Sequence, residues 1–427
     1  MKVALLGPYA LDPNSPADRP PLPGGVEAVV LALAIGLAQQ QGVEVSVVTA
    51  LPGIPRLFQA AGEGFSLFCV LRPRGGRLTG QRAVVAALRD QVRALRPDIV
   101  HAHIAGVYAR AALETGLPSV VTLHGIIRRE MQQAWPGIPW STRLRWLIDA
   151  RAEGRAVVAA REIIAISPYV LAEFRHKTAA RFHLIENPVA DAFFADAARP
   201  APGAQRILCV ARIIPRKGIL ALIEAFATVA QAHPGATLAL AGELDSAPEY
   251  VAACRGRAAA LGVASRVIFL GALPPEQVRA EYAAADIFAL ASEQETAPVS
   301  IAEAMAAGRP VVTSDVGGCA AMVEHGVTGL VVPPRDGAAL ADALAALLAD
   351  PTRAARMGQA GHAAAYARFR LGPVVEKTLA VYRQVIDARL SAAEGPADRR
   401  RGRPPIVFPG SAEDQLGQVR APDGDME

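Results

Sequence analysis

Cysteine, aromatic residues and long apolar runs are all scarce in this chain of 427 residues. Its 4 cysteines are dispersed, without the paired spacing of a zinc site or the density of a disulfide framework. No segment has the uninterrupted apolar length of a membrane span, and the first apolar run is too short for a signal peptide. We therefore expect a protein of the reducing cytoplasm.

The chain also lacks a strong excess of charge. Its 44 Lys and Arg residues against 40 Asp and Glu give a formal net charge of +4, which does not favour nucleic acid as a partner but leaves room for an anionic substrate. A hydrophobic fraction of 52% with 20% charged residues is typical of a globular protein. At this length one hydrophobic core is not enough, so we expect two domains.

Strand-like and helix-like segments alternate, which predicts parallel sheets with crossover helices. After a Pro- and Ala-rich stretch at 197–204, which resembles an interdomain linker, the alternation starts again. We therefore predict an α/β fold with two Rossmann-like, doubly wound domains facing a cleft, at 1–190 and 203–370. The predicted strands are 2–6, 44–49, 99–101, 119–123 and 162–166, then 206–210, 237–241, 267–270, 287–290, 311–313 and 329–332.

The C-terminal residues differ from this pattern. Residues 374–390 predict a long final helix. Residues 391–427 are rich in arginine and proline without helical periodicity, so we expect a disordered, solvated tail.

Two glutamates, Glu295 and Glu303, lie eight positions apart across a predicted helix start. Pro298 is tolerated in a first helical turn, and Gly308 is well suited to follow a helix end. Free backbone N–H groups at such a start favour an anion. A sugar nucleotide fits this arrangement, with one carboxylate for ribose and one for the sugar. The alternative, a surface helix with two solvated acids, stays open on this pair alone.

Two cations follow the first predicted strand of the second domain. Arg212 ends the strand, and Lys217 lies after a turn at the start of the next helix. Fixed cations at the carboxyl end of a strand stabilise the charge that develops on a departing diphosphate. Arg offers a bidentate fork and Lys a point charge. Two solvated loop cations are the alternative.

With these segments in view, the chain resembles the retaining glycosyltransferases of family 4 (glycosyl transferases group 1), which have the GT-B fold. The resemblance covers most of residues 1–388. One departure is Ala297-Pro298, where this family usually has an aromatic residue and Gly. The motifs that carry the resemblance are Gly24-Gly25-Val26-Glu27, Val121-Thr-Leu-His124-Gly125, Ile185-Glu-Asn187-Pro188, Arg212 with Lys217, Glu295 with Glu303, and Gly317-Gly318.

The resemblance implies transfer of a glycosyl group, with retention, from a nucleoside diphosphate sugar to a glycan, lipid-linked or small-molecule acceptor. It assigns the leaving diphosphate to Arg212 and Lys217, and the donor sugar to Glu295 and His124. It also implies that no metal or other cofactor takes part, and the one Asp-x-Asp pair, Asp423 to Asp425, lies in the predicted tail. The implied donor-binding residues are Gly24, Gly25, Gly271, Val299 and Glu303.

Several of these positions have a structural alternative. Gly24-Gly25 either approaches a phosphate or only forms a turn, and Gly317-Gly318 either approaches the nucleotide or opens a helix. His101 and His103 end a predicted strand, where a structural polar cap is at least as good an interpretation. Asn187 precedes a proline and is expected to shape the hinge loop.

Two other functions fit the same residues. A sugar-nucleotide epimerase of similar architecture also needs Arg, Glu and His around a diphosphate. A noncatalytic subunit that only binds the nucleotide is consistent with the departure at Ala297-Pro298. The dinucleotide glycine fingerprint is missing, which argues against hydride transfer.

A basic, tryptophan-containing segment of the first domain suggests a peripheral contact with an anionic membrane surface on the cytoplasmic side. The alternative is a helix with a solvated basic face and buried indoles. The segment contains Trp135, Trp140 and Trp146 among Arg128, Arg129, Arg143, Arg145, Arg151 and Arg155.

Overall fold

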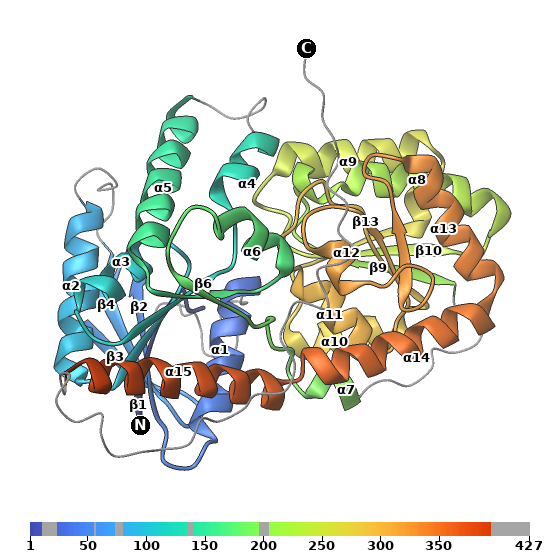
Figure 1. Ribbon diagram of the computed structural model, residues 1–427. Helices are drawn as coiled ribbons and strands as arrows, with labels where there is room; N and C mark the ends of the chain where they lie inside the picture. Colours follow the sequence, from blue (N-terminus) through green and yellow to red (C-terminus); the bar gives the residue numbers. More distant parts are fainter. Residues whose placement is uncertain (11–23, 55–56, 73–79, 135–139, 196–204, 394–427) are drawn as a thin grey trace. The chain divides into compact units, whose positions relative to one another are not determined.

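A computed structural model describes residues 1–10, 24–54, 57–72, 80–134, 140–195 and 205–393. Within them the chain forms two sheets, one from each half, with helices packed around both (Figure 1). This confirms the predicted α/β class with two parallel-sheet domains. The predicted linker at 197–204, the arginines of the predicted tail and Trp135 all lie outside the described residues.

The first sheet has eight strands in the order β3-β4-β2-β1-β5-β6-β7-β8. Every neighbouring pair is parallel except β3 and β4, which form an antiparallel pair at one edge. The strands are β1 (Lys2–Leu6), β2 (Glu44–Leu51), β3 (Leu57–Ala61), β4 (Ser66–Leu71), β5 (Ile99–His103), β6 (Ser119–Leu123), β7 (Glu162–Ala165) and β8 (Arg181–Leu184).

The second sheet has six parallel strands in the order β11-β10-β9-β12-β13-β14. The central pair, β9 and β12, is formed by segments far apart in sequence, with Phe288 opposite Leu208. This pairing brings the loops that follow the two strands to the same edge. The strands are β9 (Arg206–Val210), β10 (Thr237–Ala241), β11 (Val267–Gly271), β12 (Ile287–Leu290), β13 (Val311–Ser314) and β14 (Gly329–Val332).

Helices connect the strands of each sheet, as parallel pairing requires. In the first half these are α1 (Gly25–Ala38), α2 (Gly80–Leu95), α3 (Val107–Glu114), α4 (Ile127–Ala134), α5 (Trp140–Ala159), α6 (Pro168–Phe174) and α7 (Ala192–Ala195). In the second half they are α8 (Ile219–Ala232), α9 (Pro248–Ala260), α10 (Pro275–Ala284), α11 (Val299–Ala306), α12 (Cys319–Met322), α13 (Gly337–Ala349), α14 (Pro351–Arg368) and α15 (Leu371–Ala393). Of the described helices, none combines the length and apolar character needed to cross a bilayer.

The first sheet buries both of its faces because successive side chains of a strand point to opposite sides. Along β1, Ala4 and Leu6 belong to one hydrophobic cluster, whereas Val3 and Leu5 belong to another. Val375 and Tyr382 of α15 complete the second cluster, so the last helix packs back onto the first sheet (Figure 1). The predicted helix at 374–390 is therefore present, extended at both ends.

A third cluster surrounds the second sheet, whose strands are the nearly continuous apolar runs expected of a parallel sheet covered on both faces. All four residues of β12, Ile287 to Leu290, are buried. A strand with no exposed face cannot carry charged side chains, so the polar residues lie in the loops that follow the strands.

Candidate active site

Lys217 and Glu295 form an ion pair at the carboxyl edge of the second sheet. Lys217 ends the short 3₁₀ turn η2 (Pro215–Lys217) that follows β9, and Glu295 lies in the loop between β12 and α11. The ammonium of Lys217 and the hydroxyl of Ser292 donate to the same oxygen, Oε1 of Glu295, the second at 2.7 Å. Only 5% of Glu295 is exposed, so this carboxylate is held in one orientation.

A second cation also acts on Glu295. The guanidinium of Arg216 lies 4.0 Å from Oε2 of Glu295 and donates to the backbone and side-chain oxygens of Gln294, at 3.0 and 3.1 Å. Burial alone would raise the pKa of Glu295, but the charges of Lys217 and Arg216 outweigh burial and hold the pKa below its usual value. Glu295 is therefore an ionised carboxylate in the resting protein, with both of its hydrogen bonds from Lys217 and Ser292 on Oε1.

Close backbone contacts fix the loop around Glu295. Gly317 has a φ of 55°, and a Cβ atom there would lie 1.7 Å from the carbonyl oxygen of Glu295. At Gly218, with a φ of 65°, a Cβ atom would lie 1.9 Å from the carbonyl oxygen of Ala291. The structure thus gives these glycines a packing role, since only a residue without Cβ fits. The nucleotide contact considered for Gly317-Gly318 stays a prediction.

Glu303 is partly buried on helix α11, about one turn after the helix start at Val299. The hydroxyl of Tyr282 donates to Oε2 of Glu303 at 3.0 Å and also lies 3.0 Å from the carbonyl oxygen of Ser300. Desolvation by the surrounding side chains raises the pKa of Glu303 to about 7. The two glutamates thus differ in their electrostatic environment. Cations compensate the charge of Glu295, whereas the partner of the Glu303 carboxyl group is the neutral hydroxyl of Tyr282.

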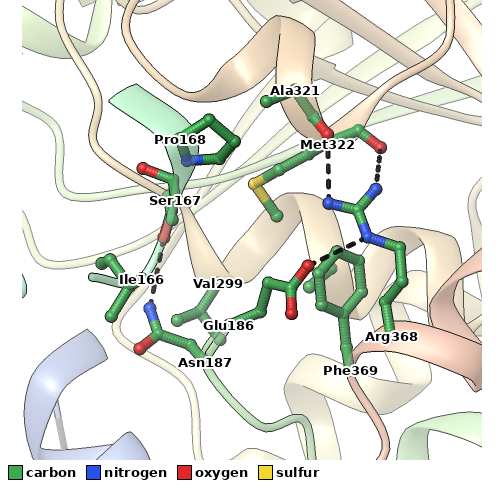
Figure 2. Close-up of a pocket in the computed structure, with 12 residues that line it drawn as sticks. Ile166, Ser167, Pro168, Glu186, Asn187, Val299, Ala321, Met322, Arg368 and Phe369 are labelled. Atoms are coloured by element: carbon green, nitrogen blue, oxygen red, sulfur yellow. Dashed lines mark hydrogen bonds and ion pairs between the residues drawn. The ribbon is translucent and has the colours of Figure 1, made fainter. Parts of the chain in front are cut away.

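The start of α11 lines a pocket (Figure 2). Val299 is the first residue of the helix after Pro298, and the first N–H groups of a helix have no partner inside it. Asn187 donates to the carbonyl oxygen of Ala297 at 3.5 Å, which ties the loop before the helix to the segment after β8. The hinge-loop interpretation of Asn187 agrees with this contact.

Arg368 closes another side of the same pocket. Its guanidinium donates to the carbonyl oxygen of Ala321 at 3.0 Å and contacts that of Met322 at 3.5 Å, at the C-terminal end of α12. It also pairs with Glu186 at 3.3 Å (Figure 2). These bonds hold the end of α14 against the segment that leads out of the first half.

His124 follows β6 of the first sheet and is joined to the Glu295 loop by one residue. The hydroxyl of Thr296 donates to the carbonyl oxygen of His124 at 2.8 Å, and Ser167 donates to the carbonyl oxygen of Thr296, also at 2.8 Å. Thr296, the residue next to Glu295, thus connects the Glu295 loop with two loops of the first half. The structure therefore brings His124 and Glu295 into one neighbourhood.

Three buried histidines stack beside one another at the ends of β5 and β6. His101 has partners on both ring nitrogens, Tyr382 and Thr122, each at 2.6 Å, as a structural polar group would. His103 and His124 share one hydrogen bond of 2.9 Å, and among the described residues Nε2 of His103 and Nδ1 of His124 have no partner. Desolvation lowers the pKa of His124 to about 4 and that of His103 well below its usual value, so both rings are neutral.

The remaining predicted site residues do not contact this network. Arg212 is exposed, and within the described part of the chain its side chain has no hydrogen bond or ion pair. Gly24 and Gly25 are exposed at the start of α1, where a Cβ on Gly25 would meet nothing within 4 Å. Gly271 ends β11 with a φ of 73° and equally open surroundings. The turn alternative for Gly24-Gly25 agrees with this openness.

Sequence reasoning missed three residues that hold the site together: Arg216, Tyr282 and Thr296. Arg216 is adjacent to Lys217, and this position in the same turn was a usable signal. Tyr282 and Thr296 have no such signal in the sequence, because a tyrosine in a helix and a threonine in a loop are ordinary residues until their partners are known. Among the described residues no cluster of His, Cys, Asp or Glu has the arrangement of a metal site.

Comparison with known proteins places this chain in a family. Residues 23–193 match the model of glycosyltransferase family 4, and residues 194–364 match glycosyl transferases group 1. A D-inositol 3-phosphate glycosyltransferase of Nocardia farcinica is 39% identical over 171 residues, 39% of this chain and 38% of that relative, so the chain spans well under half of its length in this match.

Two longer matches cover both halves. A D-inositol 3-phosphate glycosyltransferase of Acidothermus cellulolyticus is 30% identical over 328 residues, which is 69% of each chain. The solved structure of sucrose-phosphate synthase from Thermosynechococcus elongatus shares the fold, with a TM-score of 0.74 at 24% identity over 91% of this chain and 99% of that one. The chain belongs to glycosyltransferase family 4 and has the two-domain GT-B fold of that family.

Proposed function

We propose that this protein transfers a sugar from a nucleoside diphosphate sugar to an acceptor hydroxyl. The observation that carries the proposal is the Lys217–Glu295 ion pair beside the start of α11, with Glu303 further along the same helix. A cation, free helix amides and two separate carboxylates match the diphosphate, the sugar and the ribose of such a donor. Family membership supports this proposal.

In this proposal the reaction depends on charge stabilisation. The bond between the sugar and the diphosphate breaks, the acceptor oxygen bonds to the sugar carbon, and the proton of the acceptor passes to the departing phosphate. Lys217 and Arg212 stabilise the charge that grows on that phosphate. Donor phosphate would compete with Glu295 for Lys217, so donor binding would loosen the resting ion pair. Retention of configuration follows from the family and is part of the proposal.

Glu295 is assigned to orient the donor sugar. Its Oε1 already accepts from Lys217 and Ser292, which leaves Oε2 as the oxygen with room for a sugar hydroxyl. Burial and two adjacent cations make Glu295 a weak nucleophile, since its charge is already compensated. We therefore assign it a binding role and do not propose a covalent intermediate on it.

The acceptor class is proposed from the relatives. Two of them are named for transfer to D-inositol 3-phosphate, so phosphorylated inositols are the first acceptors to test, followed by glycans and lipid-linked sugars. The test incubates the protein with UDP- and GDP-sugars, with each acceptor and without, and measures released nucleoside diphosphate and product. We expect release to require an acceptor and to persist in a chelator, since we propose that no metal takes part.

Other outcomes contradict the proposal. An isomerised donor in the absence of acceptor indicates an epimerase. Binding of a nucleotide without release under any acceptor indicates a noncatalytic subunit. Strict dependence on added manganese or magnesium contradicts the metal-free chemistry.

Replacing each glutamate separately should distinguish their roles. Glu303→Gln should weaken the free nucleoside diphosphate and the intact donor alike, because the lost charge-assisted hydrogen bonds of about 1.5–3 kcal/mol serve the ribose of both. Glu295→Gln should weaken only the donor, because the free nucleotide has no sugar. Calorimetric titration of both ligands measures this difference. Equal binding of both ligands by Glu303→Gln and the parent would remove Glu303 from the site.

We also propose that α5 rests on an anionic membrane surface. Trp140 is 77% exposed and Leu144 is 48% exposed one turn later, next to the exposed Arg145. An apolar pair flanked by cations suits the boundary between lipid headgroups and acyl chains. Such contact would place the protein at the inner face of the membrane.

Cosedimentation with vesicles tests this surface. At low salt the parent should bind vesicles containing phosphatidylserine and should release from them as salt is raised, because screening weakens the attraction. Trp140→Ala should weaken binding, whereas Val158→Ala, at another exposed apolar residue of α5, should not. No binding of the parent at low salt would exclude the membrane contact.

A further inference from the structure

Tyr282 is a fully buried side chain whose only polar atom meets the helix that carries Glu303. Its ring packs between Phe193, with ring centroids 5.9 Å apart, and Phe288, at 5.7 Å. These contacts fix the ring, so the hydroxyl has one position. That position is 3.0 Å from Oε2 of Glu303 and 3.0 Å from the carbonyl oxygen of Ser300.

One hydroxyl hydrogen faces two acceptors here, and this has a chemical consequence. When Glu303 is ionised, the Tyr282 hydroxyl donates to it, which orients the carboxylate and leaves Oε1 for another donor. When Glu303 is protonated, Tyr282 is free to donate to Ser300 and to accept from the carboxyl group. The hydrogen bond from Tyr282 to Oε2 therefore stabilises the ionised form of Glu303, in which Oε1 can accept a further hydrogen bond.

The same hydroxyl also touches the first turn of α11, through the carbonyl oxygen of Ser300. A fixed donor at this point holds the helix start, with its free amides, in a constant relation to Glu303. The aromatic contacts extend this support to Phe193 of α7, the last described helix before the second half.

We propose that Tyr282 is the positioning residue that holds the Glu303 carboxylate, through Oε2, ready to accept hydroxyl groups of the donor ribose at Oε1. This inference rests on the proposed function and deepens it. It concerns a residue that makes no contact with the donor itself and acts only through Glu303 and the start of α11.

The pH dependence provides a readout that a purely structural role would not change. Burial raises the pKa of Glu303, and the Tyr282 hydrogen bond lowers it in part; within the described residues no charged group adds to these two influences. The thiol of Cys209, which acts on Tyr282, has a pKa of about 12 and stays neutral. Removing the hydroxyl should therefore shift the Glu303 titration to higher pH.

The test compares Tyr282→Phe with the parent and with Tyr382→Phe, a matched control that removes another fully buried hydroxyl, bonded to His101 of the first half. UDP, GDP and ADP are titrated by calorimetry from pH 5.5 to 8.5. We expect Tyr282→Phe to weaken the nucleotide that binds the parent by about 5- to 15-fold at pH 7, the effect of one lost hydrogen bond. As the pH is lowered, nucleotide binding by Tyr282→Phe should also begin to decline at a higher pH than nucleotide binding by the parent. Tyr382→Phe should change neither.

A second measurement needs no ligand. The infrared difference between the parent and Glu303→Gln gives the carboxylate signal of Glu303 across the same pH range, and Tyr282→Phe should move its midpoint upward. An unchanged midpoint, or unchanged nucleotide affinity in Tyr282→Phe, overturns the inference. If none of the three nucleotides binds the parent, the proposed function is wrong, and the infrared midpoint still decides whether Tyr282 acts on Glu303.

Discussion

Lys217→Ala should lower turnover by about 10²–10³-fold, comparable to the loss of one preorganised donor to a developing oxyanion. As the glycosidic bond stretches, negative charge grows on the phosphate oxygen, so a fixed ammonium stabilises the transition state more than the ground state. Donor affinity should fall less, because Arg212 still neutralises part of the resting charge. Steady-state kinetics at saturating donor measures the effect. Lys217→Arg should restore activity only in part, since a planar fork cannot occupy the same point.

The same substitution should destabilise the resting protein, because it leaves the carboxylate of Glu295 buried beside Arg216 alone. The lowered pKa of Glu295 means that its ion pairs contribute stability above the unfolded pKa, and that this contribution is lost as pH falls through the folded pKa. Lys217→Ala should therefore flatten the acid side of the stability profile. Lys2→Ala, which breaks an exposed pair with Glu44, is the matched control and should change little.

Normal turnover of a folded Lys217→Ala protein at saturating donor would contradict this account. Lys217 would then contribute only uniform binding of the ground state and the transition state.

Gly317→Ala should abolish activity and destabilise the second half by more than about 4 kcal/mol, a magnitude reached only by a few mechanisms. The new Cβ would lie 1.7 Å from the carbonyl oxygen of Glu295, and a backbone atom cannot rotate away as a flexible side chain can. The Glu295 loop must then move, and with it the pairing to Lys217. Thermal unfolding and donor titration measure the two effects.

Gly326→Ala is the control for backbone strain alone. Gly326 also has a positive φ, 81°, but a Cβ atom there would meet nothing within 4 Å. Its substitution should cost about 1–2 kcal/mol, the strain of a left-handed conformation, and should leave donor binding intact. If both variants lose the same stability and both keep donor binding, the close approach of Gly317 does not position Glu295.

The sequence predicted most of the fold because buried parallel strands are short apolar runs between helical segments. The bounds of β1, β6, β9, β10, β12 and β14 agree with the predicted ranges. The edge strands β3 and β8 were missed, and so was β4, which lies between β3 and β2. β8, with the sequence Arg-Phe-His-Leu, is only partly buried, so it lacks the apolar signal of a central strand.

The candidate site was predicted as a set of residues and not as an arrangement. Lys217 was predicted to stabilise the leaving diphosphate, and its pairing with Glu295 in the resting structure was not foreseen; two opposite charges buried at the same sheet edge stabilise each other. That edge is created by the pairing of β9 with β12, which no local pattern reveals. Tyr282 and Thr296 were missed for the same reason, since their roles come from partners distant in sequence.

The central claim is that the Glu295 loop and helix α11 bind a nucleoside diphosphate sugar, and a thermal-shift panel of UDP, GDP, ADP and their sugars tests it most directly. A ligand at 100 times its dissociation constant stabilises the native state by about 2.7 kcal/mol, which is a measurable rise in Tm. We predict such a rise for one nucleotide and its sugar, reduced to about half or less in Glu303→Gln and kept in Glu324→Gln, a control at an exposed glutamate outside the site. If no ligand raises the Tm of the parent, or if the rise is the same in both variants, the claim is wrong.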